Sequence, residues 1–254
     1  MIKIKNADQI QKMRASGELA ANILNRLCDM IRPGITTLEI DQAAGQFIAE
    51  AGAKSAFYRY RNFPGQICIS LNEEVVHGIG SERKIVYGDL VKLDVGVIYN
   101  GWIGDNAISL PVGVVDTEVE RLITVTEESL QSCLKFARAG RRLGDICSSI
   151  ENYIIDNGYS IVREFVGHGV GQKLHEDPQI PNYGRRGTGP KLKPGMTLAI
   201  EPMVNMGKPD VRLLDDEWTV VASDGLPSSH FEHTILITKD EPEVLTWPRK
   251  TLLN

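Results

Sequence analysis

The feature that most constrains the fold is an internal repeat, in which two pairs of predicted helices lie 106 residues apart. Apolar residues at helical spacing predict a helix over residues 7–30. After Pro33-Gly34 they predict a second helix, capped by Thr37 and running to about Ala51. Residues 117–138 and 143–157 repeat this pattern. Two unrelated helical hairpins would also share glycine punctuation, but the aligned positions favour a duplicated unit. The aligned pairs are Gly34 and Gly140, Ile40 and Ile146, Phe47 and Tyr153, Ile48 and Ile154, and Gly52 and Gly158.

Sequence typical of β-strands follows each helical pair. Helix pairs that alternate with hairpins predict an α+β fold, in which helices cover one face of an antiparallel sheet. Residues 182–194 are rich in Gly, Arg and Pro and predict a surface loop. No linker is evident, so we expect one domain, residues 1–254, with two pseudo-symmetric halves. The strand-like segments are residues 67–71, 90–99 and 102–111 in the first half, and residues 160–165, 197–205, 218–222 and 231–238 in the second.

Composition excludes several classes of protein. A chain of 254 residues with 42% hydrophobic and 24% charged residues is neither disordered nor a disulfide scaffold. The net charge of −5 leaves no basic excess for a broad phosphate footprint, so DNA and other nucleic acids are not expected as the main ligand. Four cysteines without CxxC spacing indicate reduced, buried thiols. No signal peptide or membrane span is evident, so we expect a cytoplasmic monomer that does not bind membranes.

The clearest local signal is a hairpin that carries two aspartates. Asn100-Gly101 is a preferred two-residue turn, and it pairs Gly96 with Asp105. Asp94 and Asp105 then share one face as diagonal neighbours, about 7–8 Å apart. Small residues opposite them leave space, which a pair of divalent metal ions would fill. The alternative is that both carboxylates face solvent at a sheet edge.

Further candidate ligands are glutamates within apolar strands and histidines beside glycines. Glu201 and Glu232 lie in strand-like runs, where a carboxylate needs a partner unless the strand is at an edge. His168 lies between two glycines, and His175 follows in the same glycine-rich loop. His77 ends an apolar strand, although a lone histidine is more often structural. Four carboxylates and one imidazole favour Mn²⁺, Fe²⁺ or Co²⁺, without excluding Zn²⁺.

These segments together resemble the type I methionine aminopeptidases over nearly the whole chain. The gap between His168 and Glu201 is too short for the helical insertion of type II enzymes. Five candidate ligands spread over separate segments, with both accessory histidines, make the resemblance specific. The matching segments are ICISLNEEVVHGI, GDLVKLDVGV with GWIGD, REFVGHGVG with LHEDP, LKPGMTLAIEPMV and FEHTILIT.

The resemblance implies a single catalytic domain with the pita-bread fold around a dinuclear metal centre. It implies removal of the N-terminal methionine from nascent polypeptides whose second residue is small, by a bridging hydroxide that attacks the first peptide carbonyl. Glu201 is then also the proton shuttle, and His77 and His175 contact the substrate and stabilise the tetrahedral intermediate. The implied metal ligands are Asp94, Asp105, His168, Glu201 and Glu232.

The resemblance also implies a methionine pocket formed by Tyr60, Phe63, Cys68 and Trp218, with His77 at its rim. An unbranched thioether suits such a lining. The alternative for each aromatic residue is ordinary core packing. The sequence departs from the family around the second aspartate, at Leu174 where phenylalanine is common, and at Phe63 where tyrosine is common, but no departure removes a ligand.

Two other functions fit the sequence less well than a methionine aminopeptidase. Prolidase and aminopeptidase P carry an extra N-terminal domain, and this chain begins with the first helix pair. A non-catalytic binding module would be expected to have lost ligands. Because the family acts on emerging chains, Arg185-Arg186, Lys191 and Lys193 could serve a transient ribosome contact, although ordinary solubilising charge is the favoured explanation for them.

Overall fold

The structure is a computed structural model and describes residues 1–247, so the end of the expected domain, residues 248–254, lies outside the described residues. The helices are α1 (Ala7–Cys28), α2 (Thr37–Glu50), α3 (Thr117–Cys133) and α4 (Leu143–Asp156). The second helix of each pair recurs at an offset of 106 residues. No helix in this part of the chain combines the length and apolar character needed to cross a bilayer.

The cap of α2 and the end of α3 differ from the prediction for physical reasons, whereas the ends of α1, α2 and α4 differ by only one or two residues. The cap of α2 is Thr36, because its hydroxyl accepts a hydrogen bond from the Glu39 N–H at 3.1 Å, so Thr37 is the first helical residue. The predicted helix 117–138 ends at Cys133 and continues as a 3-10 turn, Leu134–Phe136. A tighter last turn is a common way to satisfy the carbonyls at a helix end.

The main sheet runs in the order β1-β4-β5-β14-β9-β7-β8, with β2 also paired to β4 and β15 to β14. All of its pairings are antiparallel. Two three-stranded sheets, β13-β10-β6 and β11-β12-β3, adjoin it. The strands are β1 (Lys54–Ser55), β2 (Cys68–Leu71), β3 (Glu74–Val76), β4 (Leu90–Tyr99), β5 (Trp102–Pro111), β6 (Ser160–Ile161), β7 (Gly167–Gly169), β8 (Glu176–Ile180), β9 (Thr197–Ile200), β10 (Met203–Asn205), β11 (Val211–Leu213), β12 (Val220–Ala222), β13 (Ser228–His230), β14 (Glu232–Leu236) and β15 (Glu243–Val244).

The strand predictions for the first half hold better than those for the second. The hairpin strands β4 and β5 have the predicted bounds. In contrast, the predicted strand 197–205 is interrupted between β9 and β10, and 160–165 shortens to the two residues of β6. The segment 218–222 shortens to β12, and 231–238 becomes β14 with β13 before it. The glycine-rich loop around His168 is in fact strand β7, because it pairs with both β8 and β9.

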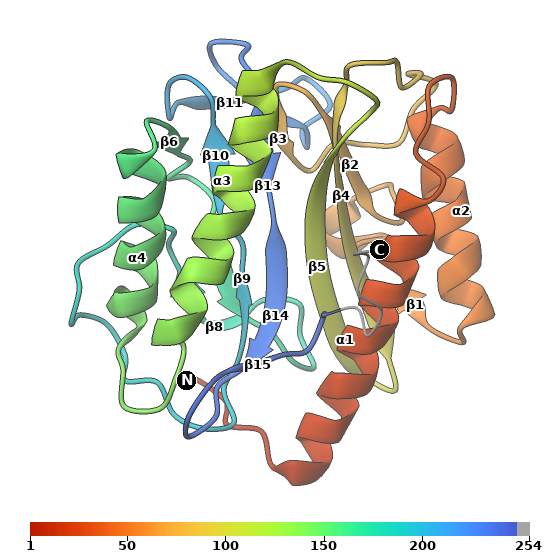
Figure 1. Cartoon of the computed structure of the whole chain (residues 1–254). Helices are drawn as coiled ribbons and strands as arrows, with labels where there is room; N and C mark the ends of the chain where they lie inside the picture. Colours follow the sequence, from red (N-terminus) through yellow and green to blue (C-terminus); the bar gives the residue numbers. More distant parts are fainter. Residues whose placement is uncertain (248–254) are drawn as a thin grey trace.

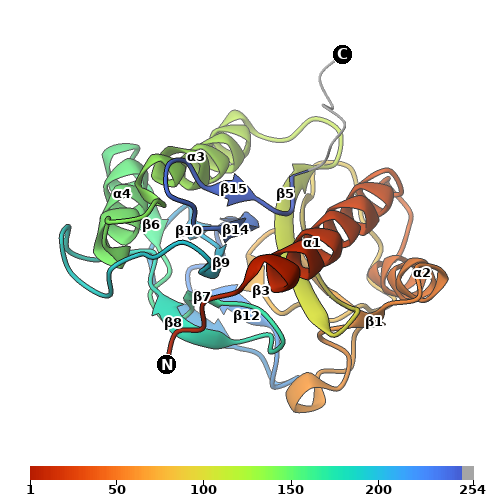
Figure 2. The same cartoon turned by 90° about the horizontal axis from the view of Figure 1, so that it is seen from below.

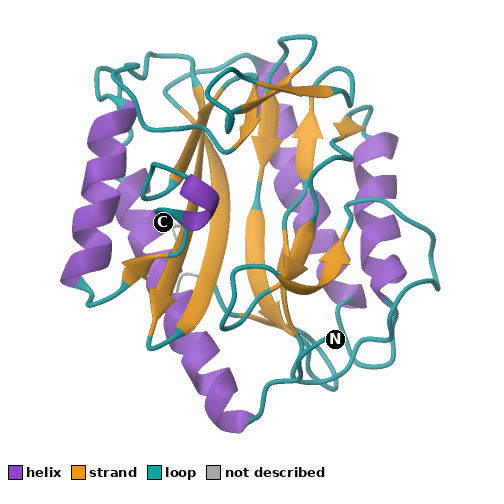
Figure 3. Ribbon diagram, turned by 180° about the vertical axis from the view of Figure 1, so that it is seen from behind, coloured by secondary structure: helices purple, strands orange, loops and turns teal. Residues whose placement is uncertain are grey.

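The helices cover one face of the main sheet and leave the other face for the site. Figure 1 shows α1 and α3 in front of the strands, and Figure 3 shows the same strands from behind, in front of the helices. In Figure 2 both helix pairs lie along the same side of the molecule. Gly104 of β5 faces α1, where an added Cβ would lie 2.2 Å from the Ser16 carbonyl oxygen. Because side chains alternate, Asp105 points to the opposite face.

The hydrophobic core therefore forms between helices and sheet in two matching parts. In the first half, Val91, Leu93, Val95 and Val97 of β4 are fully buried against apolar residues of α1 and α2. In the second half, buried residues of α3 and α4 pack on Leu198, Ile200 and Ile235. The fold prediction is confirmed, since helices shield one face of a mostly antiparallel sheet in both halves.

Candidate metal centre and adjoining pocket

Sheet order brings the predicted ligands together. Five consecutive strands of the main sheet, β4, β5, β14, β9 and β7, carry one candidate each, with Glu201 directly after β9. Asp94 lies opposite Ala107, which lies opposite Glu232, so these residues form one row across three strands. Residues directly opposite one another share a face of the sheet. Chain segments far apart in sequence thus deliver their carboxylates to the face that the helices leave free.

The hairpin has the predicted register, but not the predicted space. Gly96 pairs with Asp105, and Tyr99 pairs with Trp102 around the turn. The expectation that Gly96 leaves room for metal is wrong, because a Cβ there would lie 2.4 Å from the ring of Phe57. The small residue accommodates an aromatic side chain instead, and this ring also lines the cavity beside the carboxylates.

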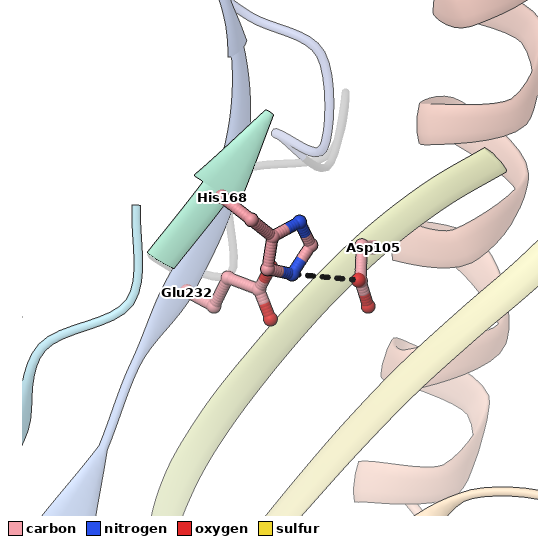
Figure 4. Close-up of side chains that lie close together, drawn as sticks. All are labelled: Asp105, His168 and Glu232. Carbon is pink, nitrogen blue, oxygen red and sulfur yellow. Dashed lines mark ion pairs between the residues drawn. The ribbon is translucent and has the colours of Figure 1, made fainter. Parts of the chain in front are cut away.

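Asp105, His168 and Glu232 form the tightest group, and Figure 4 shows their side chains pointing toward one another. One ligand atom from each lies within 4.8 Å of the others. His168 Nε2 is 3.9 Å from Asp105 Oδ2 and 3.5 Å from Glu201 Oε1. Burial lowers the pKa of His168 to about 3, with His175 adding to this effect. The imidazole is therefore neutral, and these separations are too long for hydrogen bonds.

Burial also disfavours the charged form of the four carboxylates. It raises the pKa of Asp105 to about 7 and that of Asp94 well above its usual value. The pKa values of Glu201 and Glu232 rise well above their usual values, first from burial and then from neighbouring carboxylates. Asp94 Oδ1, Asp105 Oδ1 and Glu232 Oε1 are buried without a hydrogen-bond partner among the described residues. Orphaned buried carboxylate oxygens on one face fit bound divalent cations.

The second nitrogen of His168 fixes its tautomer. Nδ1 lies 3.1 Å from the carbonyl oxygen of Gly169, to which it can only donate. The proton is thereby held on Nδ1, and the lone pair of Nε2 faces the carboxylates. A histidine held this way by a backbone carbonyl is arranged as a metal ligand.

The cluster opens into a cavity of about 490 Å³ that is also lined by every predicted pocket residue. Cys68 of β2 pairs directly with Asp94, so the pocket wall begins beside the candidate ligands. The ring centroids of Phe63 and Trp218 are 5.1 Å apart in an edge-to-face arrangement. The cavity lining includes Tyr60, Phe63, Cys68, His77, His175 and Trp218.

Both accessory histidines lie at this cavity and are held as neutral side chains. Burial lowers the pKa of His77 to about 4. His77 adopts a left-handed backbone conformation (φ 61°), which is uncommon for a residue other than glycine. Its ring meets those of Phe165 and Trp218 edge-to-face, at 5.4 and 6.4 Å. Burial also lowers the pKa of His175, and Arg61 lowers it further.

His230 is a residue that the sequence analysis missed. Its side chain is buried, and Nε2 lies 3.7 Å from Glu201 Oε2, without a hydrogen-bond partner in the described part of the chain. The Glu201 carboxylate is therefore flanked by two imidazoles, since His168 approaches its other oxygen. Strand alternation counted back from Glu232 would have identified His230, because positions 230 and 232 have the same parity.

Comparison with known proteins identifies the family to which the chain belongs. A family model described as "Metallopeptidase family M24" matches residues 11–239. The chain belongs to metallopeptidase family M24. It is 48% identical, over 246 residues, to "Methionine aminopeptidase" of Clostridium perfringens, covering 97% of this chain and 99% of that protein. It also matches a crystal structure of methionine aminopeptidase from Rickettsia prowazekii at 42% identity and a TM-score of 0.96, covering 97% and 100% of the two chains.

These M24 relatives confirm the resemblance to the methionine aminopeptidases and the pita-bread fold, and they make the chain a metallo-exopeptidase by class. The prolidase from Pyrococcus furiosus is more distant, at 24% identity with a TM-score of 0.78 over 97% of this chain and 66% of that chain. That likeness shows a shared fold only.

Proposed function

We propose that the protein removes the N-terminal methionine from polypeptides whose second residue is small. The observation that carries this proposal is the sharing of one cavity. Buried carboxylates that need cations and an apolar pocket lie side by side, joined by the Cys68–Asp94 pair. A free amine held near the cations would place the first side chain in the pocket and the first peptide carbonyl between them.

We assign the metal ligands to Asp94, Asp105, His168, Glu201 and Glu232, as a site for two divalent ions of Co²⁺, Mn²⁺, Fe²⁺ or Zn²⁺. The donor set supports this, because four carboxylates nearly neutralise two such charges. Ions bound there would polarise the carbonyl and lower the pKa of a shared water toward neutrality. The orphaned oxygens of Asp94, Asp105 and Glu232 are the support from this chain itself.

The remaining polar side chains have roles in proton transfer and charge stabilisation. Glu201, with a raised pKa, accepts the proton of the water that attacks the carbonyl and later releases it to the leaving amine. His77 and His175 are neutral and offer N–H donors to the developing oxyanion. When a substrate displaces water from the cavity, such donors act more strongly than they would in solvent.

Specificity comes from the pocket lined by Tyr60, Phe63, Cys68 and Trp218. Edge-to-face rings leave a slot for an unbranched side chain, and a thioether gains favourable contacts at aromatic edges. Burial raises the pKa of Cys68 well above its usual value, so its thiol is a neutral part of the wall.

The test is metal-dependent release of methionine from Met-Ala-Ser, with Met-Leu-Ser as the matched peptide. We expect release from the first peptide only after a divalent ion is added, and much slower release from the second. Absence of release with each of the four ions would refute the proposed function.

Further parts of the proposal concern the cellular setting. We propose a cytoplasmic monomer that acts as a single domain over residues 1–254 and contacts the ribosome transiently. The support for ribosome contact is the exposure of Arg185, Arg186, Lys191 and Lys193 in the loop between β8 and β9. Charge reversal of Arg185 and Arg186 should weaken co-sedimentation with ribosomes and leave tripeptide cleavage unchanged.

A further inference from the structure

One wall of the pocket is hydrogen-bonded to an accessory histidine from the other half of the chain. The hydroxyl oxygen of Tyr60 lies 2.7 Å from Nδ1 of His175. Their ring centroids are 5.4 Å apart, with the planes tilted by 48°. This contact joins positions 115 residues apart and is a full hydrogen bond by distance.

The backbone that presents Tyr60 is strained. Arg59, Arg61 and Asn62 have φ angles of 64°, 49° and 73°, although none of them is glycine. Such conformations are unfavourable for residues other than glycine and persist only where their surroundings enforce them. The left-handed residues flank Tyr60 on both sides, so the strain fixes where its ring and hydroxyl point.

Neighbouring hydrogen bonds enforce this conformation. The Ser55 hydroxyl accepts from the N–H groups of Phe57 and Tyr58, at 3.0 and 2.9 Å, and donates to the Gln66 carbonyl at 2.6 Å. The Arg59 N–H donates to the Phe63 carbonyl at 2.8 Å and closes the loop. Several hydrogen bonds therefore hold the backbone on both sides of Tyr60, as expected for a strained loop at a functional site.

The chemistry of the pair decides which atom donates. The guanidinium of Arg61 lies 5.5 Å from the centroid of the Tyr60 ring, so a neutral His175 adds no like charge beside it. A neutral imidazole has one donor and one acceptor nitrogen. A phenol is the more acidic partner and an imidazole nitrogen the more basic one, so the hydroxyl donates to Nδ1.

We propose that Tyr60 is a positioning residue that holds His175 in the tautomer protonated at Nε2, so that Nε2–H is the donor offered to the substrate. The kinetic part of this inference rests on the proposed function, whereas the tautomer does not. Because the Tyr60 ring also lines the pocket, a side chain that fills the pocket packs on the group that orients the donor. The Tyr60 side chain then contributes both to recognition of the first residue and, through His175, to stabilisation of its carbonyl.

The tautomer is tested on the metal-free protein by long-range proton–nitrogen NMR spectra of the histidine rings. His175→Ala assigns the signal of His175 by its loss. We expect Nε2–H in the unsubstituted protein and a mixture of both tautomers in Tyr60→Phe. A proton on Nδ1 in the unsubstituted protein, or the same tautomer in both proteins, would overturn the proposal.

The kinetic consequence is tested by a double-mutant cycle with Met-Ala-Ser. Tyr60→Phe keeps the ring, so KM should stay within about twofold while kcat falls about tenfold, the usual effect of one lost hydrogen bond. In the His175→Ala background the same change should have no further effect. Effects that multiply instead, or no effect of Tyr60→Phe alone, would contradict the role.

The control is Tyr58→Phe, which removes a hydroxyl from an exposed tyrosine of the same loop. It should match the unsubstituted protein in kcat and in tautomer. If the unsubstituted protein releases no methionine, the proposed function fails, but the NMR comparison still decides the role of Tyr60.

Discussion

Lys92 and Asp94 lie two residues apart on the same face of β4, yet their surroundings differ. Lys92 is buried, and Asp94 is partly buried with its Oδ1 inaccessible to solvent. The ammonium of Lys92 donates to the backbone carbonyls of Asn72 and Ser228, at 2.7 and 2.8 Å. Asp94 Oδ1 has no partner among the described residues. Burial lowers the pKa of Lys92 to about 7 and raises that of Asp94, so the same desolvation acts on both.

The difference between the two shows how one strand serves structure and function. At Lys92 the sheet supplies acceptors from two other segments, so the charged group ties these segments together. At Asp94 the neighbouring groups are further carboxylates, so no described residue supplies a counter-charge there. A buried charge that is satisfied by protein atoms indicates a structural role, whereas a cluster of unsatisfied ones indicates a ligand site.

The largest effect is expected on turnover when Asp94, the residue without a protein partner for its Oδ1, is replaced. Asp94→Ala should lower turnover of Met-Ala-Ser at least ~10³-fold, because a site for two ions loses a ligand. The melting temperature of the metal-free protein should not fall, since one of several mutually repelling carboxylates is gone. Asp215→Ala, at an exposed aspartate, is the control for both measurements. Turnover near that of the unsubstituted protein would contradict the assignment of Asp94 as a ligand.

The pH dependence of stability sharpens the same contrast. Burial raises the pKa of Asp105 to about 7 in the folded chain, from 3.8 for a free aspartate, so the folded state binds more protons than the unfolded one between these pH values. The contribution of this group to the stability of the metal-free protein is therefore fully present at and below about pH 4, and it is lost as pH rises toward 7, by on the order of a few kcal/mol.

Thermal unfolding between pH 5 and 8 measures this effect. With Mn²⁺ added the decline should be absent, because bound cations stabilise the ionised carboxylates and the folded state. Buried histidines with lowered pKa values contribute the opposite slope below about pH 6.5, so the comparison is made with Asp105→Asn. The same pH dependence in Asp105→Asn as in the unsubstituted protein would show that Asp105 does not cause the decline.

For Lys92, whose ammonium is hydrogen-bonded to protein carbonyls, we expect that replacement lowers stability. Lys92→Met should destabilise the fold by about 2–3 kcal/mol, because two buried carbonyls lose their donor. Denaturant unfolding measures this, and Lys84→Met, at an exposed lysine, should have little effect. Methionine release per folded molecule should stay within about twofold, since the carbonyls, not the ligands, are affected. Unchanged stability of Lys92→Met would refute the structural role of this ammonium.

How much the sequence predicts follows from how local each feature is. The β4–β5 hairpin has the predicted bounds and register because Asn100-Gly101 and strand alternation act over neighbouring residues. Strand β7 was missed because glycines flank His168, and its strand conformation comes from pairing with β8 and β9. β8 contains Pro178, and a proline makes a strand prediction less favourable for that segment.

The site shows the same division. Asp94 and Asp105 can be paired from the hairpin alone, whereas Glu201 and Glu232 could be grouped with them only as carboxylates in apolar strands that need a partner, without a predicted position relative to the hairpin. No local pattern encodes that β14 inserts between β5 and β9. The strain around Tyr60 is likewise hidden, because arginine and asparagine occupy positions where glycine would have indicated positive φ. Packing against distant segments supplies what these local patterns lack.

The smallest effect is expected at Gly96, where the sequence suggested space and the structure places Phe57. Gly96→Ala would put a Cβ 2.4 Å from the Phe57 ring, so the ring must shift. Overpacking of this kind costs about 1 kcal/mol or more. That corresponds to a fall of about 3 °C in the melting temperature. Gly101→Ala in the open turn is not a matched control, because Gly101 has a positive φ. Instead, Gly96→Ala is combined with Ala56→Gly, which removes the contact of the added Cβ with the Ala56 Cβ at 3.1 Å. If the Phe57 ring alone sets the clash, Ala56→Gly should not rescue the Gly96→Ala protein, and full rescue would assign the close packing to the side chain of Ala56 and not to the ring.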